Sequence, residues 1–391
     1  MQRATPSETA LPAPSDVAAP PAAAPAWACR VAFCGPIGAA GKPAGGGYEA
    51  ANRRTCDALA RRGLSVIELP YPKTVSGALQ KLLRYAWCFA KAGAYLLAQR
   101  ERYDVLHLTP LNAHFALAET LLASCARLMG KPVLVDIRAG TFMRHYQGAG
   151  LLYRSTIDRT LRLASRVAVE GQEYMMFARH RSSHPVFYFP NYVDNPALRA
   201  APGPRRLERG ETVRLLYFGR LVPEKGISTA LQALALLVEA GQRVQLEFIG
   251  EGPAAFLTPL QQTYAHLPVT WSASQPVHEV MRLAANAHFF FFASRHDGEG
   301  HSNALNEAMA VGLVPVCSAQ GFARSVVGNA GIVLAPDAKA ADYAAAIESV
   351  LAKGCWAELS ARAHERVRSL YSEEAAVPPL IETYRLMLQR S

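Results

Sequence analysis

Short apolar runs alternate with segments of helical periodicity along most of the chain. In the first half, the runs bounded by turn residues predict strands at residues 31–34, 64–69, 105–108, 133–137, 167–169 and 186–189. Most of these runs are separated by a helical pattern, and the alternation restarts at residue 213. Repeated strand–helix order predicts a parallel sheet with helices on both faces, so we expect an α/β fold with two such units.

Changes in composition divide the chain. Residues 1–28 are rich in Ala and Pro and lack the basic-then-apolar layout of a signal peptide. We therefore expect a disordered leader and a cytoplasmic protein, with attachment to the inner face of a membrane as an extension of that placement. The expected units are a first domain at 29–200, a linker at 201–212, a second domain at 213–372 and a terminal segment at 373–391, helical over 380–388 after Pro378 and Pro379.

Composition narrows the class of protein. A chain of 391 residues, 50% hydrophobic and 18% charged, fits two domains with sizeable cores. It contains no run of 18 apolar residues without charge, so a membrane-spanning helix is not expected. The seven cysteines show no Cys-x-x-Cys spacing. This pattern favours a reducing compartment and argues against a disulfide framework or a zinc site.

Positive charge is concentrated in the first half. Residues 1–205 carry 25 Lys/Arg against 13 Asp/Glu, whereas residues 206–391 carry 16 against 18. A basic domain attracts phosphates and anionic membranes, so we expect an anionic membrane surface or a lipid-diphosphate acceptor as partner. A solvated basic surface without a partner is the alternative. No nucleic-acid recognition motif occurs, so nucleic acid is not expected.

The segment 76–102 combines basic, aromatic and aliphatic residues at helical spacing. Basic helices that carry aromatics can lie on membranes. However, the apolar residues nearly surround this helix, which favours burial over a narrow amphipathic face. Core packing and membrane contact both remain open, and they can coexist at different ends of the helix.

Two carboxylates, Glu299 and Glu307, flank a predicted strand-to-helix junction. An apolar run at 289–293 precedes them, and Ser302 and Asn303 are helix N-cap types. Glu299 is therefore expected on a loop at the carboxyl edge of a sheet, where open α/β sheets bind ligands. Carboxylates accept hydrogen bonds from the vicinal hydroxyls of sugars and riboses, and a helix N-terminus attracts phosphate. The alternative is that both are solvated surface acids.

Two cations, Arg220 and Lys225, lie between an apolar run at 215–218 and an amphipathic segment at 227–238. The planar fork of Arg and the mobile ammonium of Lys both suit phosphate oxygens. A pair of solvated loop cations is the alternative.

A glycine run at 45–47 follows the first strand. Gly46 and Gly47 would let the backbone approach a ligand and would leave N–H groups free at a helix start, although a flexible surface loop explains the run equally simply.

Three pieces, in a fixed order, carry a family resemblance. They are Gly219-Arg220-Leu221-Val222-Pro223-Glu224-Lys225-Gly226, then Phe248-Ile249-Gly250-Glu251-Gly252-Pro253, then Glu299 with Glu307-Ala308-Met309-Ala310-Val311-Gly312. In these pieces the sequence resembles the retaining, nucleotide-sugar-dependent glycosyl transferases group 1 family. The resemblance is specific over most of residues 210–350 and looser upstream. It implies two Rossmann-like, doubly wound domains in the GT-B arrangement, with a donor cleft between them and a terminal helix that packs back on the first domain.

The resemblance also implies roles for particular residues. Arg220 and Lys225 would hold the donor diphosphate, Glu299 would face the transferred sugar and Glu307 would bind the ribose hydroxyls. Further donor contacts, mostly through main-chain groups, are expected from Gly219, Gly300, His301, Ser302, Asn303, Gly46 and Gly47. Because other residues often take the place of His301 in the family, its side chain is given no chemical role.

The chain departs from the family pattern in two loops. Many members have a His near the place of Arg138, which could instead clamp an acceptor phosphate or a donor oxygen. His145, seven residues further on, is a second acceptor-side candidate, although a satisfied surface or core histidine explains it as well. In the loop 321–325, Phe322 and Ser325 stand where the family usually has a glycine and an acid, which leaves backbone contacts to the donor but removes a side-chain contact.

The resemblance implies transfer of a sugar from a nucleotide diphosphate sugar to a hydroxyl acceptor, with retention at the anomeric carbon. The expected role is in the assembly of a cell-surface polysaccharide or glycolipid. The family view is a front-face displacement in which cationic side chains stabilise the leaving diphosphate, so no metal and no cofactor are expected. A nucleotide-sugar epimerase of the same fold and a non-catalytic nucleotide-sugar-binding subunit are the alternatives. A nicotinamide dehydrogenase is not expected, because the Gly-x-Gly-x-x-Gly fingerprint is missing.

Overall fold

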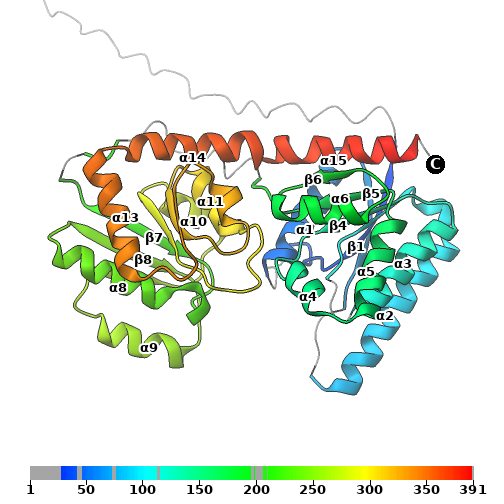
Figure 1. The fold of residues 1–391 in the computed structure, drawn as a ribbon, viewed down its shortest axis with the longest axis horizontal. Coiled ribbons are helices and arrows are strands. Elements are labelled where there is room, and N and C mark those ends of the chain that lie inside the picture. The colour runs from blue at the N-terminus through cyan, green and yellow to red at the C-terminus, as the bar shows by residue number, and fades with distance from the viewer. Residues whose placement is uncertain are drawn as a thin grey trace, which may run out of the picture.

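The computed structural model describes residues 28–41, 46–72, 76–111, 115–194, 198, 206–208 and 210–389. Almost all of the expected leader, half of the expected linker and Gly45 lie outside the described residues. Figure 1 shows two α/β lobes side by side, with two consecutive helices, α14 and α15, running along one edge of both.

The first lobe is built on a six-stranded parallel sheet in the order β2-β1-β3-β4-β5-β6. Its strands are β1 (Arg30–Gly35), β2 (Ser65–Pro70), β3 (Val105–Leu108), β4 (Val133–Ile137), β5 (Arg166–Val169) and β6 (Val186–Tyr188). Its helices are α1 (Gly47–Arg61), α2 (Ala78–Ala98), α3 (Ala116–Leu128), α4 (Phe142–Gly148), α5 (Leu151–Leu163) and α6 (Met175–Arg181). The central strands β3 and β4 are buried along their whole length, which explains why they are apolar apart from His107 and Asp136.

The second lobe has another six-stranded parallel sheet, in the order β12-β11-β10-β7-β8-β9. Its strands are β7 (Val213–Phe218), β8 (Val244–Ile249), β9 (Val269–Ser272), β10 (Phe289–Phe292), β11 (Val314–Ser318) and β12 (Ile332–Leu334). Its helices are α8 (Ile227–Glu239), α9 (Ala254–Thr263), α10 (Val277–Ala284), α11 (Asn303–Ala310), α12 (Ala323–Val327), α13 (Ala340–Lys353) and α14 (Trp356–Leu370). This is the Rossmann strand order, whose topological switch point lies between β7 and β10. The loops after these two strands therefore flank the place where such sheets bind ligands.

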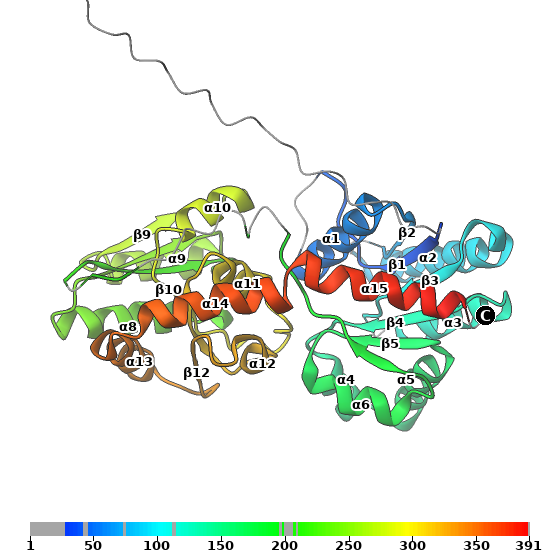
Figure 2. The ribbon, with the colours of Figure 1, turned by 90° about the horizontal axis from the view of Figure 1, so that it is seen from above.

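The last helix, α15 (Glu373–Leu388), returns to the first lobe, as the view from above shows (Figure 2). Val377, Leu380 and Tyr384 are fully buried and pack with Val31, Phe33 and other residues of the first sheet. At the start of the helix, Glu373 is buried and forms ion pairs with Arg61 and Arg62 of α1. The terminal helix is thus part of the core of the first lobe.

The terminal helix that we expected within residues 373–391 begins at residue 373, but the sequence interpretation was wrong to place its helical pattern only after Pro378 and Pro379. Both prolines lie inside α15. A proline removes a helical hydrogen bond and usually breaks a helix interior. Here both prolines lie on the exposed side of the helix, so water can reach the carbonyls that lose their partners, while the opposite side is held by the buried apolar residues.

Helix α2 is far less buried than its composition predicts. Leu96, near its C-terminal end, is its one buried residue, whereas Leu79, Leu82, Leu83 and Trp87 are each at least 60% exposed. Of the two alternatives left open by the sequence, core packing therefore holds only toward the C-terminal end. Over the described part of the chain, no helix combines the length and apolarity needed to span a membrane.

Replacing Leu380 by Ala should destabilise the first lobe by about 2–5 kcal/mol, because it opens a cavity between α15 and the first sheet. Chemical denaturation followed by circular dichroism measures the change. Glu382→Ala is the matched control on the exposed side of α15, where Glu382 pairs with Arg385, and should keep the parent's midpoint. Equal stability of Leu380→Ala and the parent would contradict the structural role assigned to α15.

Candidate active site

A cavity of about 450 Å³ lies between the two lobes. It is lined from the first lobe by Gly47, Tyr48, Leu111, Arg138, Ala139, Gly140, Thr141, Glu170 and Asn191, and from the second by Tyr217, Phe218, Gly219, Arg220, Lys225, Phe292, His296, Gly298, Glu299, Gly300, His301, Ser302, Asn303 and Ala304. A neighbouring pocket of about 350 Å³ shares Gly219 and Arg220 and includes Gly250 and Glu307. The two pockets together contain most of the residues that the sequence singled out. A larger hollow of about 1100 Å³ lies where β7 begins and α8 and α13 end, and it contains none of them.

The centre of the cavity is an ion pair between Lys225 and Glu299. The Glu299 Oε2 atom accepts hydrogen bonds from Lys225 Nζ at 2.5 Å and from Ser294 Oγ at 2.6 Å. Both charged side chains are largely buried, with 12% and 8% exposure. The pair therefore holds a cation and an acid in fixed places at the switch point, where a diphosphate and a sugar could meet both.

Glycine is required at position 226, directly after Lys225. Gly226 separates Lys225 from α8 with φ 76°, and a Cβ there would lie 2.3 Å from the carbonyl oxygen of Ala293. Only glycine accommodates both the left-handed backbone and the close approach of the loop to the end of β10. The Gly226 backbone thus brings Lys225 to the segment that carries Ser294 and Glu299.

Arg220 also lies at the cavity but is exposed. Its carbonyl oxygen accepts a hydrogen bond from Tyr217 Oη at 2.9 Å, which fixes the backbone of the loop after β7. Because Arg220 lines both pockets, its guanidinium can reach a ligand that spans them. The two predicted phosphate-binding cations thus share one wall of the site.

Glu307 lies on α11, as predicted, and faces the first lobe. Ser302 caps this helix by accepting a hydrogen bond from Leu305 N, which confirms the predicted N-cap. The carboxylate of Glu307 lies 3.7 Å from the guanidinium of Arg54 on α1. Burial raises the pKa of Glu307, although Arg54 opposes the shift. Nothing in the sequence around Arg54 indicated that this residue pairs with Glu307.

Asn303 joins the two lobes. Its amide donates to the carbonyl oxygen of Gly47 at 3.1 Å, and its Oδ1 accepts from Asn191 at 2.5 Å and from Arg54 at 3.3 Å. Gly47 is thus tied to the start of α11, while Gly46 is exposed and lies outside the lining of the cavity. A second close contact occurs at Gly140, where a Cβ would lie 2.4 Å from the carbonyl oxygen of Glu299. The described cleft is therefore closed by direct backbone contact.

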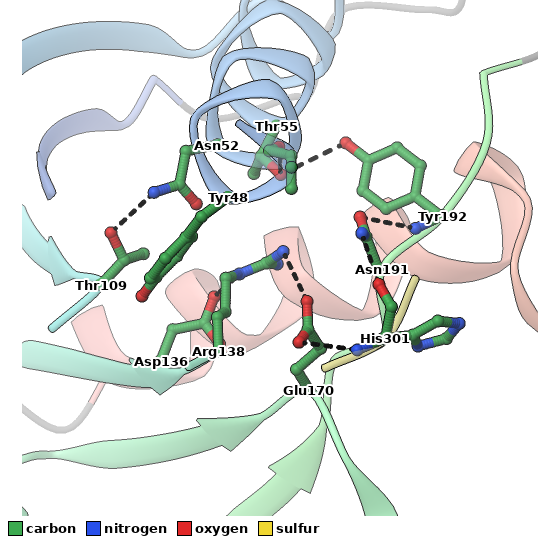
Figure 3. A network of polar contacts seen from close by, with 12 residues as sticks. Tyr48, Asn52, Thr55, Thr109, Asp136, Arg138, Glu170, Asn191, Tyr192 and His301 are labelled. Atoms are coloured by element: carbon green, nitrogen blue, oxygen red, sulfur yellow. Dashed lines mark hydrogen bonds and ion pairs between the residues drawn. The ribbon is translucent and has the colours of Figure 1, made fainter. Parts of the chain in front are cut away.

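A buried polar network supports the first-lobe side of the cavity, and Figure 3 shows the part of it that contains Asp136, Arg138 and Glu170. The Asp136 carboxylate accepts from Arg138 Nε at 2.6 Å and lies 3.3 Å from His107 Nε2, while His107 Nδ1 lies 2.6 Å from Tyr384 Oη of α15. Burial opposes ionisation of Asp136, but Arg138 and His107 outweigh burial, and the pKa of Asp136 falls below its ordinary value. Burial lowers the pKa of His107. Through Tyr384, the terminal helix α15 thus contacts the polar network beside the cavity.

Arg138 does not present its guanidinium to the open cavity. Its side chain is 1% exposed, and its Nη1 and Nη2 atoms are buried without a hydrogen-bond partner among the described residues. The guanidinium lies 4.6 Å from the ring centre of Phe189, and Nη1 lies 3.9 Å from Glu170. In this geometry Arg138 bonds Asp136 and lies beside Glu170, so its use as an acceptor clamp would need a rearrangement of its side chain.

Glu170, at the end of β5, was not identified from the sequence. Its carboxylate is buried, lines the cavity and accepts a hydrogen bond from the backbone N–H of His301 at 3.3 Å. Burial raises the pKa of Glu170 to about 8, because the ion pair with Arg138 and the N–H of His301 do not offset the loss of hydration. The group is thus an acid that carries its proton near neutral pH and faces the loop of Glu299 and Gly300.

His301 is at the site only through its backbone. Its ring packs edge-on against Tyr371 and its Nε2 lies 2.9 Å from Asn306, and burial lowers its pKa to about 4. Its N–H already bonds Glu170, and its carbonyl oxygen accepts from Asn191. The side chain therefore stays neutral and structural, in agreement with giving it no chemical role.

Two further residues singled out from the sequence, His145 and Phe322, lie away from the lining of the cavity. His145 lies on α4 outside the lining of the cavity, and its Nδ1 is buried with no partner among the described residues. It is therefore neither at the site nor the satisfied histidine that we considered as the alternative. Phe322, one of the departures from the family pattern, is buried and meets Tyr174 of the first lobe edge-on at 4.9 Å. This aromatic contact joins the lobes where the family usually has a small or acidic residue.

The residues missed by sequence reasoning are Tyr48, Arg54, Glu170, Asn191 and Ser294. Three of them had a usable signal: Glu170 and Ser294 directly follow or nearly follow a strand, and Asn191 lies in a short polar stretch after β6. Tyr48 and Arg54 lie on α1, where nothing distinguishes them from other helix residues. Among the described residues, no group of three or more metal-ligating side chains gathers at the site or elsewhere.

The Glu170→Gln variant should change the pH dependence of stability. In the parent, the pKa of Glu170 rises from 4.5 when unfolded to about 8 when folded, so the folded state holds a proton that the unfolded state releases between these values. The free energy of unfolding therefore falls as pH rises through this window, and the variant lacks this component. Denaturation at several pH values should show that the free energy of unfolding of the variant increases relative to that of the parent as the pH rises toward 8. The exposed Glu173→Gln is the control and should follow the parent; a parallel profile for Glu170→Gln would contradict the assignment.

The comparisons with known proteins agree with this geometry. Residues 204–370 match the family model described as Glycosyl transferases group 1. Two curated relatives, from Xanthomonas campestris and Xanthomonas oryzae pv. oryzae (strain PXO99A), are each named GDP-mannose:cellobiosyl-diphosphopolyprenol alpha-mannosyltransferase. Each is 28% identical over 222 residues, which are 55% of this chain and 56% of the relative. The match thus spans about half the length of these relatives.

Solved structures share the fold over nearly the whole chain. Sucrose-phosphate synthase from Thermosynechococcus elongatus superposes with a TM-score of 0.69 at 19% identity, covering 93% of this chain and 100% of that one. HepE from Anabaena, solved with UDP, superposes with a TM-score of 0.66 at 17% identity, covering 90% and 99%. These likenesses confirm the predicted α/β fold with two Rossmann-like domains. The match over residues 204–370 shows that this segment, which forms most of the second lobe, is similar to the glycosyl transferases group 1 family, whereas the solved structures show the fold alone.

Proposed function

We propose that this protein is a retaining glycosyltransferase that moves a sugar from a nucleotide diphosphate sugar to a hydroxyl acceptor. The observation that carries the proposal is the buried Lys225–Glu299 pair at the switch point of the second sheet, with Arg220 on the same wall. A cation pair suits the diphosphate, and an acid beside it suits the hydroxyls of the transferred sugar.

The donor spans the two adjoining pockets. Glu307 and Gly250 belong to the smaller pocket, and Gly219 and Arg220 belong to both. The ribose therefore lies against Glu307, the diphosphate passes Arg220 toward Lys225, and the sugar enters the larger cavity beside Glu299. In the ligand-free state, Arg54 and Lys225 neutralise the two acids that the donor's hydroxyls would meet.

Catalysis rests on the departing diphosphate. Lys225, Arg220 and the N-terminal ends of α8 and α11 stabilise the charge that develops as the glycosidic bond breaks. A double displacement needs a free carboxylate at the anomeric carbon. Glu299 is committed to Lys225 and Ser294, and Glu170 carries a proton near neutral pH because its pKa is about 8. The site therefore favours a front-face displacement in which the leaving phosphate accepts the proton of the acceptor hydroxyl.

The acceptor side is basic in composition, which favours an acceptor that carries phosphate. The curated relatives are named for GDP-mannose as donor and a cellobiosyl-diphosphopolyprenol as acceptor, and one HepE structure contains UDP-glucose. A lipid-linked saccharide diphosphate, used in the assembly of a polysaccharide or glycolipid, fits the excess of Lys and Arg over residues 1–205. Binding of GDP and UDP distinguishes the base of the donor, and release of nucleoside diphosphate from a panel of donors distinguishes its sugar.

The Glu307→Gln variant should bind nucleoside diphosphates about tenfold more weakly than the parent, because an amide accepts hydrogen bonds from the ribose hydroxyls less strongly than a carboxylate. Calorimetry or melting shifts with GDP and UDP measure the loss, and the stronger ligand identifies the base. Glu348→Gln on α13 is the control and should bind as the parent does. Unchanged affinity in Glu307→Gln would remove Glu307 from the donor site.

The Lys225→Ala and Glu299→Ala variants should each lower turnover about 100-fold or more, since each removes charge at the reacting centre. The measurement is release of nucleoside diphosphate from a panel of donors, with membrane extract as the source of acceptor. Lys353→Ala on α13 is the matched control and should keep the parent's rate. Donor binding without release by the parent would indicate a non-catalytic binding subunit, and conversion of the free donor to its epimer would indicate an epimerase.

A further inference from the structure

Exposed apolar side chains gather on three neighbouring helices of the first lobe. On α2, Leu79, Leu82, Leu83 and Trp87 are exposed by 68%, 65%, 60% and 71%. Their spacing of i, i+3, i+4 and i+8 places them on one stripe of the helix. This stripe faces solvent, whereas an ordinary amphipathic helix turns its apolar stripe toward the core.

The opposite side of α2 accounts for its attachment to the lobe. Tyr85 and Phe89 pack against Phe115, with ring centres 5.0 and 5.5 Å apart, and Gly93 approaches Leu122 of α3. The helix therefore already has its packing partner, and the exposed stripe is additional to it. A second apolar face on a packed helix needs a separate explanation.

The two neighbouring helices also carry exposed leucines. Leu117 and Leu121 on α3 are exposed by 66% and 57%, and Leu151 and Leu152, which begin α5, by 85% each. Helix α3 contacts both α2 and α5, and Figure 1 shows the three helices side by side. We call these eight residues of α2, α3 and α5 the apolar face. Monomeric soluble proteins rarely expose contiguous apolar surface on this scale without a partner.

The charge of α2 identifies the kind of partner. Residues 76–100 contain no Asp or Glu, whereas Lys81, Arg84, Lys91 and Arg100 are basic. Arg84 and Lys91 are the i−3 and i+4 neighbours of Trp87, so they flank the apolar stripe directly. Apolar and aromatic side chains flanked by cations are the combination that inserts into the interface of an anionic bilayer.

The apolar face also lies at the correct end of the lobe. Helices in a parallel α/β layer run opposite to the strands, so α2, α3 and α5 begin at the edge where the strands end. The residues of the apolar face are concentrated in the first half of each helix, near this edge. Arg138 and Glu170, which line the cavity, follow β4 and β5 at the same edge.

We propose that the apolar face of α2, α3 and α5 docks the protein onto an anionic membrane surface, with Trp87 and its leucine neighbours in the lipid interface and Arg84 and Lys91 at the headgroups. This docking presents the acceptor side of the cleft to the bilayer. In this last respect the inference rests on the proposed function, because a lipid-linked acceptor would then enter the cleft from the bound surface.

Cosedimentation of the full chain with vesicles tests the docking. The parent should bind vesicles of equimolar phosphatidylcholine and phosphatidylglycerol, bind phosphatidylcholine alone weakly, and lose binding as salt is raised. The combined variant Leu82→Ser/Leu83→Ser/Trp87→Ser should lower partitioning by about tenfold or more. Met176→Ser/Leu370→Ser, which alters exposed apolar residues on α6 and α14, is the matched control and should bind as the parent does.

Two further variants separate the contributions. Arg84→Gln/Lys91→Gln should weaken binding to anionic vesicles and reduce its salt dependence. Binding of the parent should shift its tryptophan emission to shorter wavelength, and Trp87→Phe should lose most of this shift. All the substituted side chains are exposed, so circular dichroism should show an unchanged fold.

Three results would overturn the proposal. They are failure of the parent to bind anionic vesicles, equal binding by the serine variant, and a concentration-dependent dimer of the parent that the serine variant lacks, since the face would then join two copies of the chain. Vesicle binding requires neither nucleotide nor turnover. Its failure is therefore distinguishable from a failure of the proposed transferase activity, which is measured by release of nucleoside diphosphate.

Discussion

The site depends on one desolvated contact, the ion pair between Lys225 and Glu299. A lysine and an acid that are both about nine-tenths buried remain charged only when each has the other and further polar partners. Glu299 has Lys225 and Ser294, and Lys225 additionally lies over the ring of Phe292 at 5.7 Å. The contact exists because Gly226 lets the loop after β7 approach the end of β10. The switch point thus holds a cation, paired with an acid while no ligand is bound, in a region of low dielectric, where an anionic leaving group is stabilised most strongly.

The two lobes complete each other at this point through groups that neither lobe could satisfy alone. Glu307 of the second lobe is paired by Arg54 of the first, and Asn303 bonds to Gly47 and Asn191. Glu170 of the first lobe receives a backbone N–H from the loop of the second. Separating the lobes would leave each of these polar groups without its partner, and a buried polar group without a partner is costly in free energy. The closed arrangement therefore has a polar, ligand-replaceable interface, which suits an enzyme whose donor must enter between the lobes.

The sequence predicted the strands of the first lobe closely, but it predicted the site residues of the second lobe far better than those of the first. The strand at 289–293, the Ser302 cap and the placement of Arg220, Lys225, Glu299 and Glu307 all follow from local patterns, since strand ends and helix starts are encoded by neighbouring residues. Glu170 and Asn191 follow strands, but neither this signal nor anything around Arg54 reveals their partners, which lie more than a hundred positions away. The start of α15 was mispredicted for a similar reason: tertiary burial of Val377 and Leu380 overrides the local effect of the two prolines. The exposure of α2 could not be predicted either, because the burial of a helix depends on its tertiary neighbours and its composition does not identify them.

The terminal helix connects these observations. By packing on the first sheet, α15 brings Tyr384 to His107, and through Asp136 and Arg138 this contact reaches the underside of Glu170. The first lobe thus has a buried polar network at the carboxyl edge of its sheet, and the C-terminal helix of the chain contributes to this network. The helices α2, α3 and α5 begin at the same edge and leave their apolar side chains outside. The proposed membrane-docking face and the proposed donor cavity therefore lie near the same edge because of one topological rule: in a parallel sheet, the strands end where the helices begin.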